Sequence, residues 1–397
     1  DTLVLGDFAN TLTVVSVETL TGGTDDDSVT FGAAVTAGTI DLGSGDDTVT
    51  LGNFNNTVTL SNVESINGGN LADRVTLGTA ITSGTLDLGS GSDVLVLGDF
   101  ANSLTTQNIE SIVGGTSDDV VTLAAAISGG NINLGAGDDT LTLGDFANAL
   151  TVSNVETLTG GTSTDTVTLG SQITAGTVDL GSGADTLTLG NFANTLSITN
   201  IETVRGGNSA DLVTLTSATT GAIIDLGSGA DSLTLADGAN SLTVRNVESV
   251  TGGTGDDTLS FSGAAMNGSI DLGSGDDTVT LGHFNNTVTA SNVETFTGGN
   301  SNDLITLATA MTAGTVNLAN GTDTLTLGDF ANSLTIVGVE TVIGGTSDDV
   351  VTGGAVLNAT INLGAGDDTL VLGDFVNAVT ALNIETITGG SSSDYVT

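Results

Sequence analysis

The chain has 397 residues, of which 58 are Gly, 47 are acidic and only three are basic, so its formal charge is −44. So few basic residues exclude nucleic acid as a partner, because phosphate binding needs Lys and Arg. No apolar stretch is long enough for direct membrane insertion, and the lack of Cys excludes disulfides and thiolate sites. Hydrophobic residues still make up 38% of the chain, too much for a disordered acidic tail, so we expect a folded chain that needs cations.

The first repeat contains short segments in which polar and apolar residues alternate. They lie at 10–14 (Asn-Thr-Leu-Thr-Val), 38–42 (Gly-Thr-Ile-Asp-Leu) and 48–51 (Thr-Val-Thr-Leu). Such segments, rich in β-branched residues and bounded by Gly, Asn and Asp, predict β-strands. No helical period of useful length occurs, so the predicted fold class is all-β.

A repeat of 46 residues runs through the whole chain. Glu18 recurs every 46 residues as far as Glu340, and then once more after 45 residues at Glu385. A regular repeat without a unique segment predicts a right-handed parallel β-solenoid, of the β-helix or β-roll type. We expect residues 1–397 to form one continuous segment of about 8.6 repeats, uncapped at both ends and cut from a longer array.

Each repeat divides into two halves that both begin with Asp followed by an alternating strand. Successive Asp positions are alternately 20 and 26 residues apart, with 20 residues from Asp27 to Asp47 and 26 residues from Asp47 to Asp73. Two coils per repeat are therefore predicted, a shorter one for the first step and a longer one for the second. One wide coil per 46 residues remains the alternative.

Two positions inside the repeat predict side-chain columns. Phe8, Phe54 and six later Phe residues share one position, which favours a buried aromatic ladder. Asn10, Asn56 and their counterparts fill another position in every repeat, which favours hydrogen bonds from coil to coil. Glu18 and its counterparts are expected to bond backbone amides or, alternatively, to complete an ion site.

Gly-rich turns carry the candidate functional residues. The turn at 252–260 reads Gly-Gly-Thr-Gly-Asp-Asp-Thr-Leu-Ser, and it matches the Gly-Gly-x-Gly-x-Asp-x-apolar-x nonapeptide in full. In these turns the chain resembles the repeats-in-toxin (RTX) family of calcium-binding β-solenoids, and its doublet pattern is similar to that of large bacterial surface proteins with β-strand repeats.

The resemblance implies Ca²⁺ ligands at the Asp carboxylates and at the carbonyls of neighbouring Gly residues. The implied metal ligands are Asp27, Asp47, Asp73, Asp93, Asp119, Asp139, Asp165, Asp185, Asp211, Asp231, Asp257, Asp277, Asp303, Asp323, Asp349, Asp368, Gly23, Gly45, Gly253 and Gly275.

The charge of the stacked Asp residues also predicts bound calcium, independently of the family. Stacked coils bring like carboxylates to roughly 5–10 Å, where each pair repels by about one to a few kcal/mol. Three Arg residues cannot neutralise such columns, and hard oxygen ligands select Ca²⁺ over softer metals. The alternative is that these Asp residues only shape turns, for which Asp and Gly are common.

Nothing in the sequence predicts an enzyme. The one histidine, His283, stands where other repeats carry Asp or Asn, so we expect it to be an incidental surface residue. The chain has no nucleophile set and no phosphate-binding loop leading into a helix. Its paired carboxylates repeat in every coil, whereas a catalytic pair needs a distinct environment.

The leading functional hypothesis is an extracellular structural module stabilised by calcium, such as the rod of a surface layer, a filament or an adhesin stalk. Its partners would be calcium ions and further repeats of the same protein or other copies of it. The RTX resemblance implies a secreted protein exported by type I secretion. The alternative is an accessory or ligand-binding solenoid, for carbohydrate or ice, attached to a functional domain outside this segment.

Overall fold

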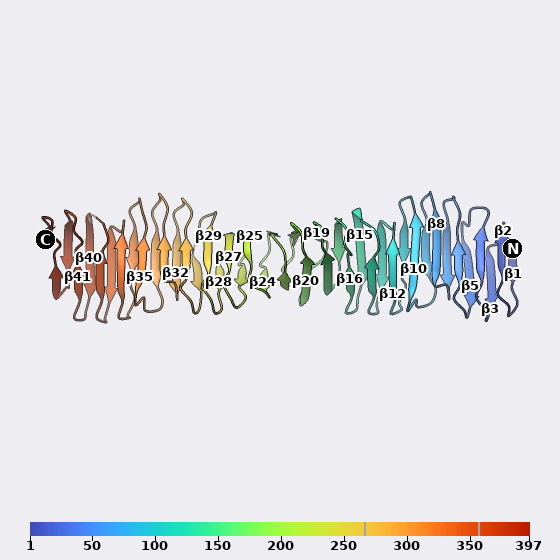
Figure 1. Ribbon diagram of the computed structural model, residues 1–397, viewed down its shortest axis with the longest axis horizontal. Helices are drawn as coiled ribbons and strands as arrows, with labels where there is room; N and C mark the ends of the chain where they lie inside the picture. The colour runs from blue at the N-terminus through green and yellow to red at the C-terminus, as the bar shows by residue number, and fades with distance from the viewer. Residues whose placement is uncertain (266, 356–357) are drawn as a thin grey trace. The chain divides into compact units, whose positions relative to one another are not determined.

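The computed structural model describes residues 1–265, 267–355 and 358–397. The chain divides into two compact units, Asp1–Ile201 and Glu202–Thr397, and each is a stack of short strands (Figure 1). None of the residues described forms a helix, so this part of the chain contains no helix that could cross a membrane.

The strands of the first unit are β1 Thr2–Val4, β2 Thr11–Val14, β3 Thr19–Gly23, β4 Ser28–Phe31, β5 Gly38–Gly43, β6 Thr48–Thr50, β7 Thr57–Ser61, β8 Ser65–Gly69, β9 Arg74–Leu77, β10 Gly84–Gly89, β11 Val94–Val96, β12 Ser103–Gln107, β13 Ser111–Gly115, β14 Val120–Leu123, β15 Ser128–Gly135, β16 Thr140–Thr142, β17 Ala149–Ser153, β18 Thr157–Gly161, β19 Thr166–Leu169, β20 Gly176–Gly181, β21 Thr186–Thr188 and β22 Thr195–Thr199.

The strands described in the second unit are β23 Thr203–Gly207, β24 Leu212–Leu215, β25 Thr220–Gly227, β26 Ser232–Thr234, β27 Ser241–Arg245, β28 Ser249–Thr251, β29 Thr258–Phe261, β30 Gly268–Asp271, β31 Thr278–Thr280, β32 Thr287–Ser291, β33 Thr295–Thr297, β34 Leu304–Leu307, β35 Gly314–Asn317, β36 Thr324–Thr326, β37 Ser333–Val337, β38 Thr341–Gly345, β39 Val350–Gly353, β40 Asn358–Gly364, β41 Thr369–Val371, β42 Ala378–Leu382, β43 Thr386–Thr388 and β44 Tyr395–Val396.

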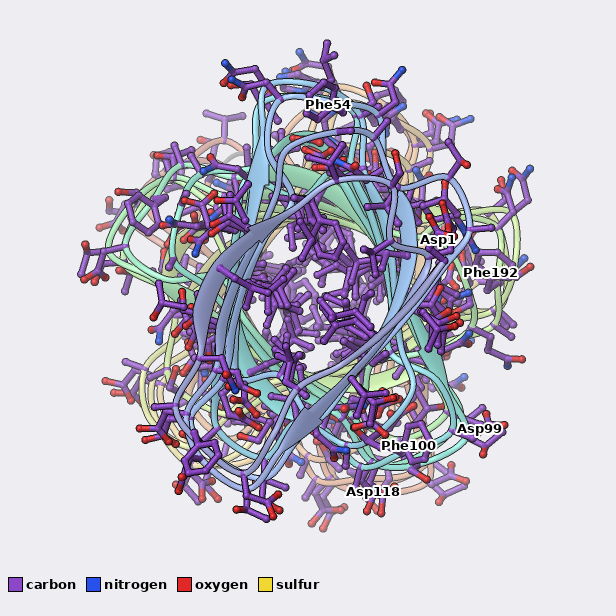
Figure 2. The ribbon with its side chains drawn as sticks, turned by 90° about the vertical axis from the view of Figure 1, so that its right-hand side faces the viewer. Asp1, Phe54, Asp99, Phe100, Asp118 and Phe192 are labelled. Atoms are coloured by element: carbon purple, nitrogen blue, oxygen red, sulfur yellow. The ribbon has the colours of Figure 1, made fainter. Side chains whose placement is uncertain are left out.

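The alternation in the sequence separates an apolar interior from a polar surface. In β6, Val49 is fully buried between Thr48 and Thr50, which are half-buried. Other strands repeat this pattern, and the inward side chains are mostly Val, Leu and Ile. The end-on view in Figure 2 shows a carbon-rich interior enclosed by the coils. Burial of these side chains is the main force that stabilises the fold.

Within each unit, every strand pairs in parallel with the strand two positions away in the chain. β6 pairs with β4 and β8, while β7 pairs with β5 and β9. The chain therefore passes from one sheet to the other and back, and two strands make one coil. This is the predicted all-β parallel β-solenoid, and it is consistent with the right-handed form.

The predicted division of the repeat into one shorter and one longer coil is wrong for the longer half. The half from Asp73 to Asp93 contains β9 and β10, which make one coil. The half from Asp47 to Asp73 contains β6, β7 and β8, which make one and a half coils. Paired residues are 17 to 21 positions apart, as in Thr48↔Ser65, so a single coil is shorter than this half. The wide coil of a whole repeat is excluded for the same reason.

Two and a half coils per repeat place equivalent residues on alternate sheets. β6 belongs to one sheet, and β11, its counterpart one repeat later, belongs to the other. Equivalent side chains return to the same sheet only after two repeats, or five coils. At roughly 4.8 Å per coil, that return spans about 24 Å.

The predicted buried ladder of Phe side chains is also wrong. Phe8, Phe146 and Phe284 are 73%, 37% and 45% exposed, respectively. Figure 2 shows Phe54 and Phe100 on opposite sides of the first unit, so successive rings do not stack. Each Phe stands in a tight turn just before a strand, and its ring covers a Gly two residues earlier, as Phe54 covers Gly52.

Candidate functional site

A ladder of hydrogen bonds runs along the corners where turns enter strands. The backbone N and Nδ2 of Asn56 both donate to Oδ1 of Asp73, at 3.0 and 2.7 Å. The backbone N of Asp73 donates to Oδ1 of Asp93 at 2.7 Å. The backbone N of Asp93 donates to Oε2 of Glu110 at 2.9 Å. These residues precede β7, β9, β11 and β13, so one Asn, two Asp and one Glu occupy four successive coils. We call this set the acidic ladder.

The acidic ladder recurs in both units and includes all sixteen Asp residues predicted as metal ligands. Complete copies run through Asn10, Asp27, Asp47 and Glu64; Asn102, Asp119, Asp139 and Glu156; Asn240, Asp257, Asp277 and Glu294; Asn286, Asp303, Asp323 and Glu340; and Asn332, Asp349, Asp368 and Glu385. Shorter runs through Asn148, Asp165 and Asp185 and through Asp211, Asp231 and Glu248 follow the same pattern within their own units.

The acidic ladder confirms the predictions made for its Asn and Glu residues. Each Asn bonds from coil to coil: the backbone N of Val35 donates to Oδ1 of Asn56, and Asn56 donates onward to Asp73. Each ladder Glu accepts from a backbone amide, as Glu110 does from Asp93. Sequence reasoning missed that the Asn and Asp series belong to one ladder. Their constant offset of 17 residues, which equals one coil step, is the signal that could have found it.

The Asp side chains of the ladder are among the most deeply buried polar groups in each unit. Asp73 and Asp93 are 2% and 0% exposed, and their counterparts are similar. In both residues Oδ1 accepts a hydrogen bond from the neighbouring coil, whereas Oδ2 is buried without a hydrogen-bond partner. A buried carboxylate oxygen without a partner is costly unless it is protonated or bound to a cation.

Burial also makes the ionised form of these carboxyls unfavourable. Desolvation raises the pKa of Asp47, Asp93 and Asp139 to about 6, from an ordinary value of 3.8. The negative charges of the ladder neighbours, such as Glu64 and Asp27 beside Asp47, add to the rise in pKa. At neutral pH these carboxyls are therefore ionised at a cost in folding free energy.

The sequence period also predicts that equivalent Asp residues of successive repeats stack in long columns, and this is wrong because equivalent residues alternate between corners. Each corner instead carries three acidic residues in successive coils, as in Asp73, Asp93 and Glu110. The charge repulsion is divided into short groups, and each group begins next to a neutral Asn.

The predicted Gly residues lie in turns that stack closely on the neighbouring coil. A Cβ at Gly23 would lie 2.4 Å from the carbonyl oxygen of Gly6, and a Cβ at Gly275 would lie 2.4 Å from that of Gly255. A Cβ at Gly253 would lie 2.6 Å from Oδ1 of Asp237. Gly45 has a φ of +147°, in the region that favours Gly. These glycines therefore allow the turns to approach each other, whether or not their carbonyls also bind an ion.

A second set of acidic residues, missed by the sequence reasoning, lies on the outer side of the same turns. The backbone N of Asp138 donates to Oδ1 of the exposed Asp118 at 2.9 Å. Figure 2 shows Asp99 and Asp118 on the outer rim, near Phe100. The Asp-Asp pair in these turns thus has one buried and one exposed member, and adjacent Asp residues are the signal. The lone His283 is exposed, as predicted.

The donor chemistry of the acidic ladder fits a hard cation, with one restriction. Buried carboxylate oxygens without partners are the groups that Ca²⁺ would satisfy. However, no group of three or more acidic or histidine side chains converges on one point among the residues that the structure describes. An ion would have to take its remaining oxygen ligands from backbone carbonyls and water.

Comparison with known proteins places the chain in no family, since no family model and no curated protein matches it. Among solved structures, it is similar to a hyperactive, Ca²⁺-dependent, β-helical antifreeze protein from an Antarctic bacterium. The identity is 17%, the match covers 93% of this chain and 83% of that one, and the TM-score is 0.12. A TM-score this low carries no functional argument, so the fold described here rests on strand pairing.

Proposed function

We propose that this chain is a structural repeat module whose folded state is stabilised by calcium ions bound along the acidic ladders. The observation that carries the proposal is the row of buried Asp carboxylates whose Oδ2 atoms have no hydrogen-bond partner, as in Asp73 and Asp93. The three Arg residues of the chain cannot neutralise these groups. A divalent cation would supply both the charge and the missing contacts.

The proposed setting is outside the cell, in a secreted rod of a surface layer, a filament or an adhesin stalk. Calcium that binds only the folded chain adds to its stability in proportion to the logarithm of its free concentration. A chain with so large a negative charge would therefore remain unfolded where calcium is scarce and fold where calcium is plentiful. This property suits export by type I secretion, followed by folding and self-association at the bacterial surface.

The proposal includes no catalytic role. The candidate acid groups are members of a repeated ladder, and the same environment recurs from Asp47 to Asp323. A catalytic pair needs two carboxyls whose pKa values are separated by different surroundings. A structural role requires only that the environment repeats.

A calcium titration after complete chelation tests the proposal. We expect circular dichroism to report a change from coil to β-structure on addition of Ca²⁺, with Mg²⁺ much less effective because it prefers a rigid octahedral site. A chelated chain that keeps its full β-signal would refute the calcium role.

Matched variants sharpen this test. Asp93→Asn keeps an acceptor oxygen for the backbone N of Asp73 and removes one buried charge. We expect this variant to be more stable than the parent chain without calcium and to gain less stability from calcium. Asp99→Asn removes an exposed charge from the turn between β11 and β12, at the opposite corner, and should change neither quantity measurably. Equal calcium responses of the Asp93 and Asp99 variants would show that the ladder does not bind the ion.

A further inference from the structure

Three residues on one outer face of the second unit depart from the repeat. Arg205 in β23, Ile223 in β25 and Arg245 in β27 lie on neighbouring strands of one sheet. Their counterparts one repeat before and one repeat after are Thr159 and Thr251, Thr177 and Ser269, and Thr199 and Ser291, respectively. In a chain with three basic residues, two of them therefore meet on one face, beside an exposed apolar side chain.

Strand register brings the two Arg residues to either side of one carboxylate. Asp225 pairs with Arg205 on one side and with Arg245 on the other. Nη1 of Arg245 lies 3.7 Å from Oδ2 of Asp225. Oδ1 of Asp225 is already occupied, since it accepts from Nδ2 of Asn246 at 2.6 Å and from the backbone N of Gly227 at 3.2 Å.

One guanidinium of this group remains available. Arg205 is exposed, and within the described part of the chain it makes no ion pair. Arg205, Ile223, Asp225 and Arg245 line the same surface cavity of about 640 Å³. Ile223 is 48% exposed there. The cavity thus combines two cations, one anion between them and one apolar side chain.

We propose that this cavity binds an acidic saccharide, with its carboxylate at Arg205 and Arg245 and its hydroxyls at Asp225. A guanidinium recognises a carboxylate through paired N–H donors. Asp225 accepts hydrogen bonds from hydroxyl groups, and the apolar face of a sugar ring can cover Ile223. This binding would not require calcium, because these side chains lie on a sheet face and not in the acidic ladder.

The carboxylate between the two Arg residues disfavours other anions. Phosphate carries more negative charge than a carboxylate and offers Asp225 fewer donors, so Asp225 would repel it more strongly. An acidic segment of a second copy of this chain would bring further negative charge against a chain of −44. A sugar acid carries one negative charge per residue together with several hydroxyl donors.

Binding of a glucuronic acid oligosaccharide to the full chain at fixed calcium tests the proposal. The double variant R205T/R245S restores residue types that the repeat already carries at these positions, so it should fold. Loss of the charge-assisted hydrogen bonds should weaken binding at least about tenfold, as measured by calorimetry. The single variant I223T should weaken binding by a smaller factor.

Arg74→Thr provides the matched control, because it removes one exposed positive charge in the first unit and restores the Thr found at Thr166. This control should bind within about twofold of the parent chain, since a distant exposed charge is screened by salt. The single variant R205T, which also removes one charge, should weaken binding more than R74T does. Equal weakening by the two would mean that only overall charge matters, and would overturn the proposal.

The choice of probe separates the remaining possibilities. Two other probes should each bind at least about tenfold more weakly than the uronate: a neutral glucose oligosaccharide of the same length, and inorganic phosphate. The first lacks the carboxylate for the Arg residues, and the second lacks the sugar hydroxyls for Asp225. Phosphate or polyglutamate binding as tightly as the uronate would overturn the assignment to a saccharide. Unchanged uronate binding by R205T/R245S would overturn the site itself.

Discussion

At the residue scale, a few polar side chains inside the corners hold successive coils together. Asn148 is 3% exposed and lies at the start of a ladder. Its Oδ1 accepts from the backbone N of Ile127 at 3.0 Å, and its Nδ2 donates to Oδ1 of Asp165 at 2.9 Å. It therefore links the coil before it to the coil after it, and its amide supplies both a donor and an acceptor.

Substitution of this Asn should cost far more than substitution of the neighbouring Phe. Asn148→Ala leaves a buried backbone N–H and a buried carboxylate each short of a partner, and we expect a loss of about 2–4 kcal/mol. Phe146→Ala removes a ring that is 37% exposed, and we expect a loss of less than about 1.5 kcal/mol. Denaturant unfolding at fixed calcium measures both, and the reverse order would restore the buried aromatic ladder as the main stabilising element.

A buried threonine offers the opposite case, in which a polar group weakens the core. Thr106 is 1% exposed, and its Oγ1 has no hydrogen-bond partner. Its counterparts Val152 and Val244 are apolar. We expect Thr106→Val to stabilise the chain by about 1 kcal/mol, because the buried hydroxyl is unpaired. Thermal unfolding checks this, with the outward-facing Thr105→Val as a control that should change stability by less than about 0.5 kcal/mol. A destabilised Thr106→Val variant would contradict the assignment.

At the element scale, the close stacking of turns explains why Gly is so frequent. A Cβ at Gly160, at the end of β18, would lie 2.2 Å from the carbonyl oxygen of Leu180 in the next coil. Backbone atoms cannot retreat from such a contact without breaking the parallel pairing of β18 with β20. The Gly-Gly pairs of the sequence therefore mark places where two coils touch through backbone alone.

Two Gly→Ala variants separate this packing role from backbone conformation. Gly160→Ala should cost more than about 3 kcal/mol and should open the coils around β18, as reported by hydrogen exchange of their amides. Gly129→Ala meets no atom within 4 Å but has a φ of +78°, so it should cost only about 1–2 kcal/mol. Similar costs for the two variants would show that coil contact is not the reason for Gly160.

The strand signal in the sequence predicted the fold class, but not the number of coils. Alternation in segments such as 48–51 correctly predicted strands, and the structure places Val49 inward there. The longer half-repeat, which begins at Asp47, hides three strands, because β7 begins right after the Asn56 turn without the Gly-Gly signal that marks other corners. The sequence period therefore predicted two coils per repeat, whereas the strand pairing forms two and a half. The same error misplaced the Phe side chains, since stacking depends on the number of coils between equivalent residues.

For the candidate site, residue types were predictable and their connections were not. The Asp-Gly turns identified Asp73 and Asp93 from their period. Their burial, and the pairing of Oδ1 with a backbone amide of the preceding coil, follow from register, which the period does not determine. The exceptional site around Arg205 and Arg245 could be located in the sequence as a departure from the repeat. That both Arg residues lie beside Asp225 could not be predicted, because it depends on the strand register that pairs Asp225 with each of them.

At the scale of the whole molecule, the charge of −44 and the buried carboxyls act in the same direction. Both oppose folding when the acidic groups are ionised. Protonation relieves both effects, and so would a bound divalent cation. If calcium binds as proposed, acid and calcium are alternative ways to stabilise the same fold, and their effects on stability should depend on each other.

This coupling gives a pH dependence with a defined sign. The carboxyls of Asp47, Asp93 and Asp277 have a folded-state pKa of about 6, against an ordinary value of 3.8. Between these values the folded chain binds more protons than the unfolded chain, so stability falls as pH rises. We expect the chelated protein to be most stable near pH 4 and to lose stability up to about pH 6. Chemical denaturation across this range measures the effect.

Calcium should weaken or reverse this slope, because an ion bound to the ladder favours the ionised carboxyls and lowers their pKa. The double variant Asp93→Asn/Asp139→Asn should show a flatter dependence of stability on pH without calcium, since two of the titrating groups are gone. Exposed acids contribute to the slope in both proteins, so the difference between the two profiles isolates the ladder. If the profiles are the same, the buried carboxyls are not the groups that titrate, and the charge of the whole surface accounts for the pH dependence.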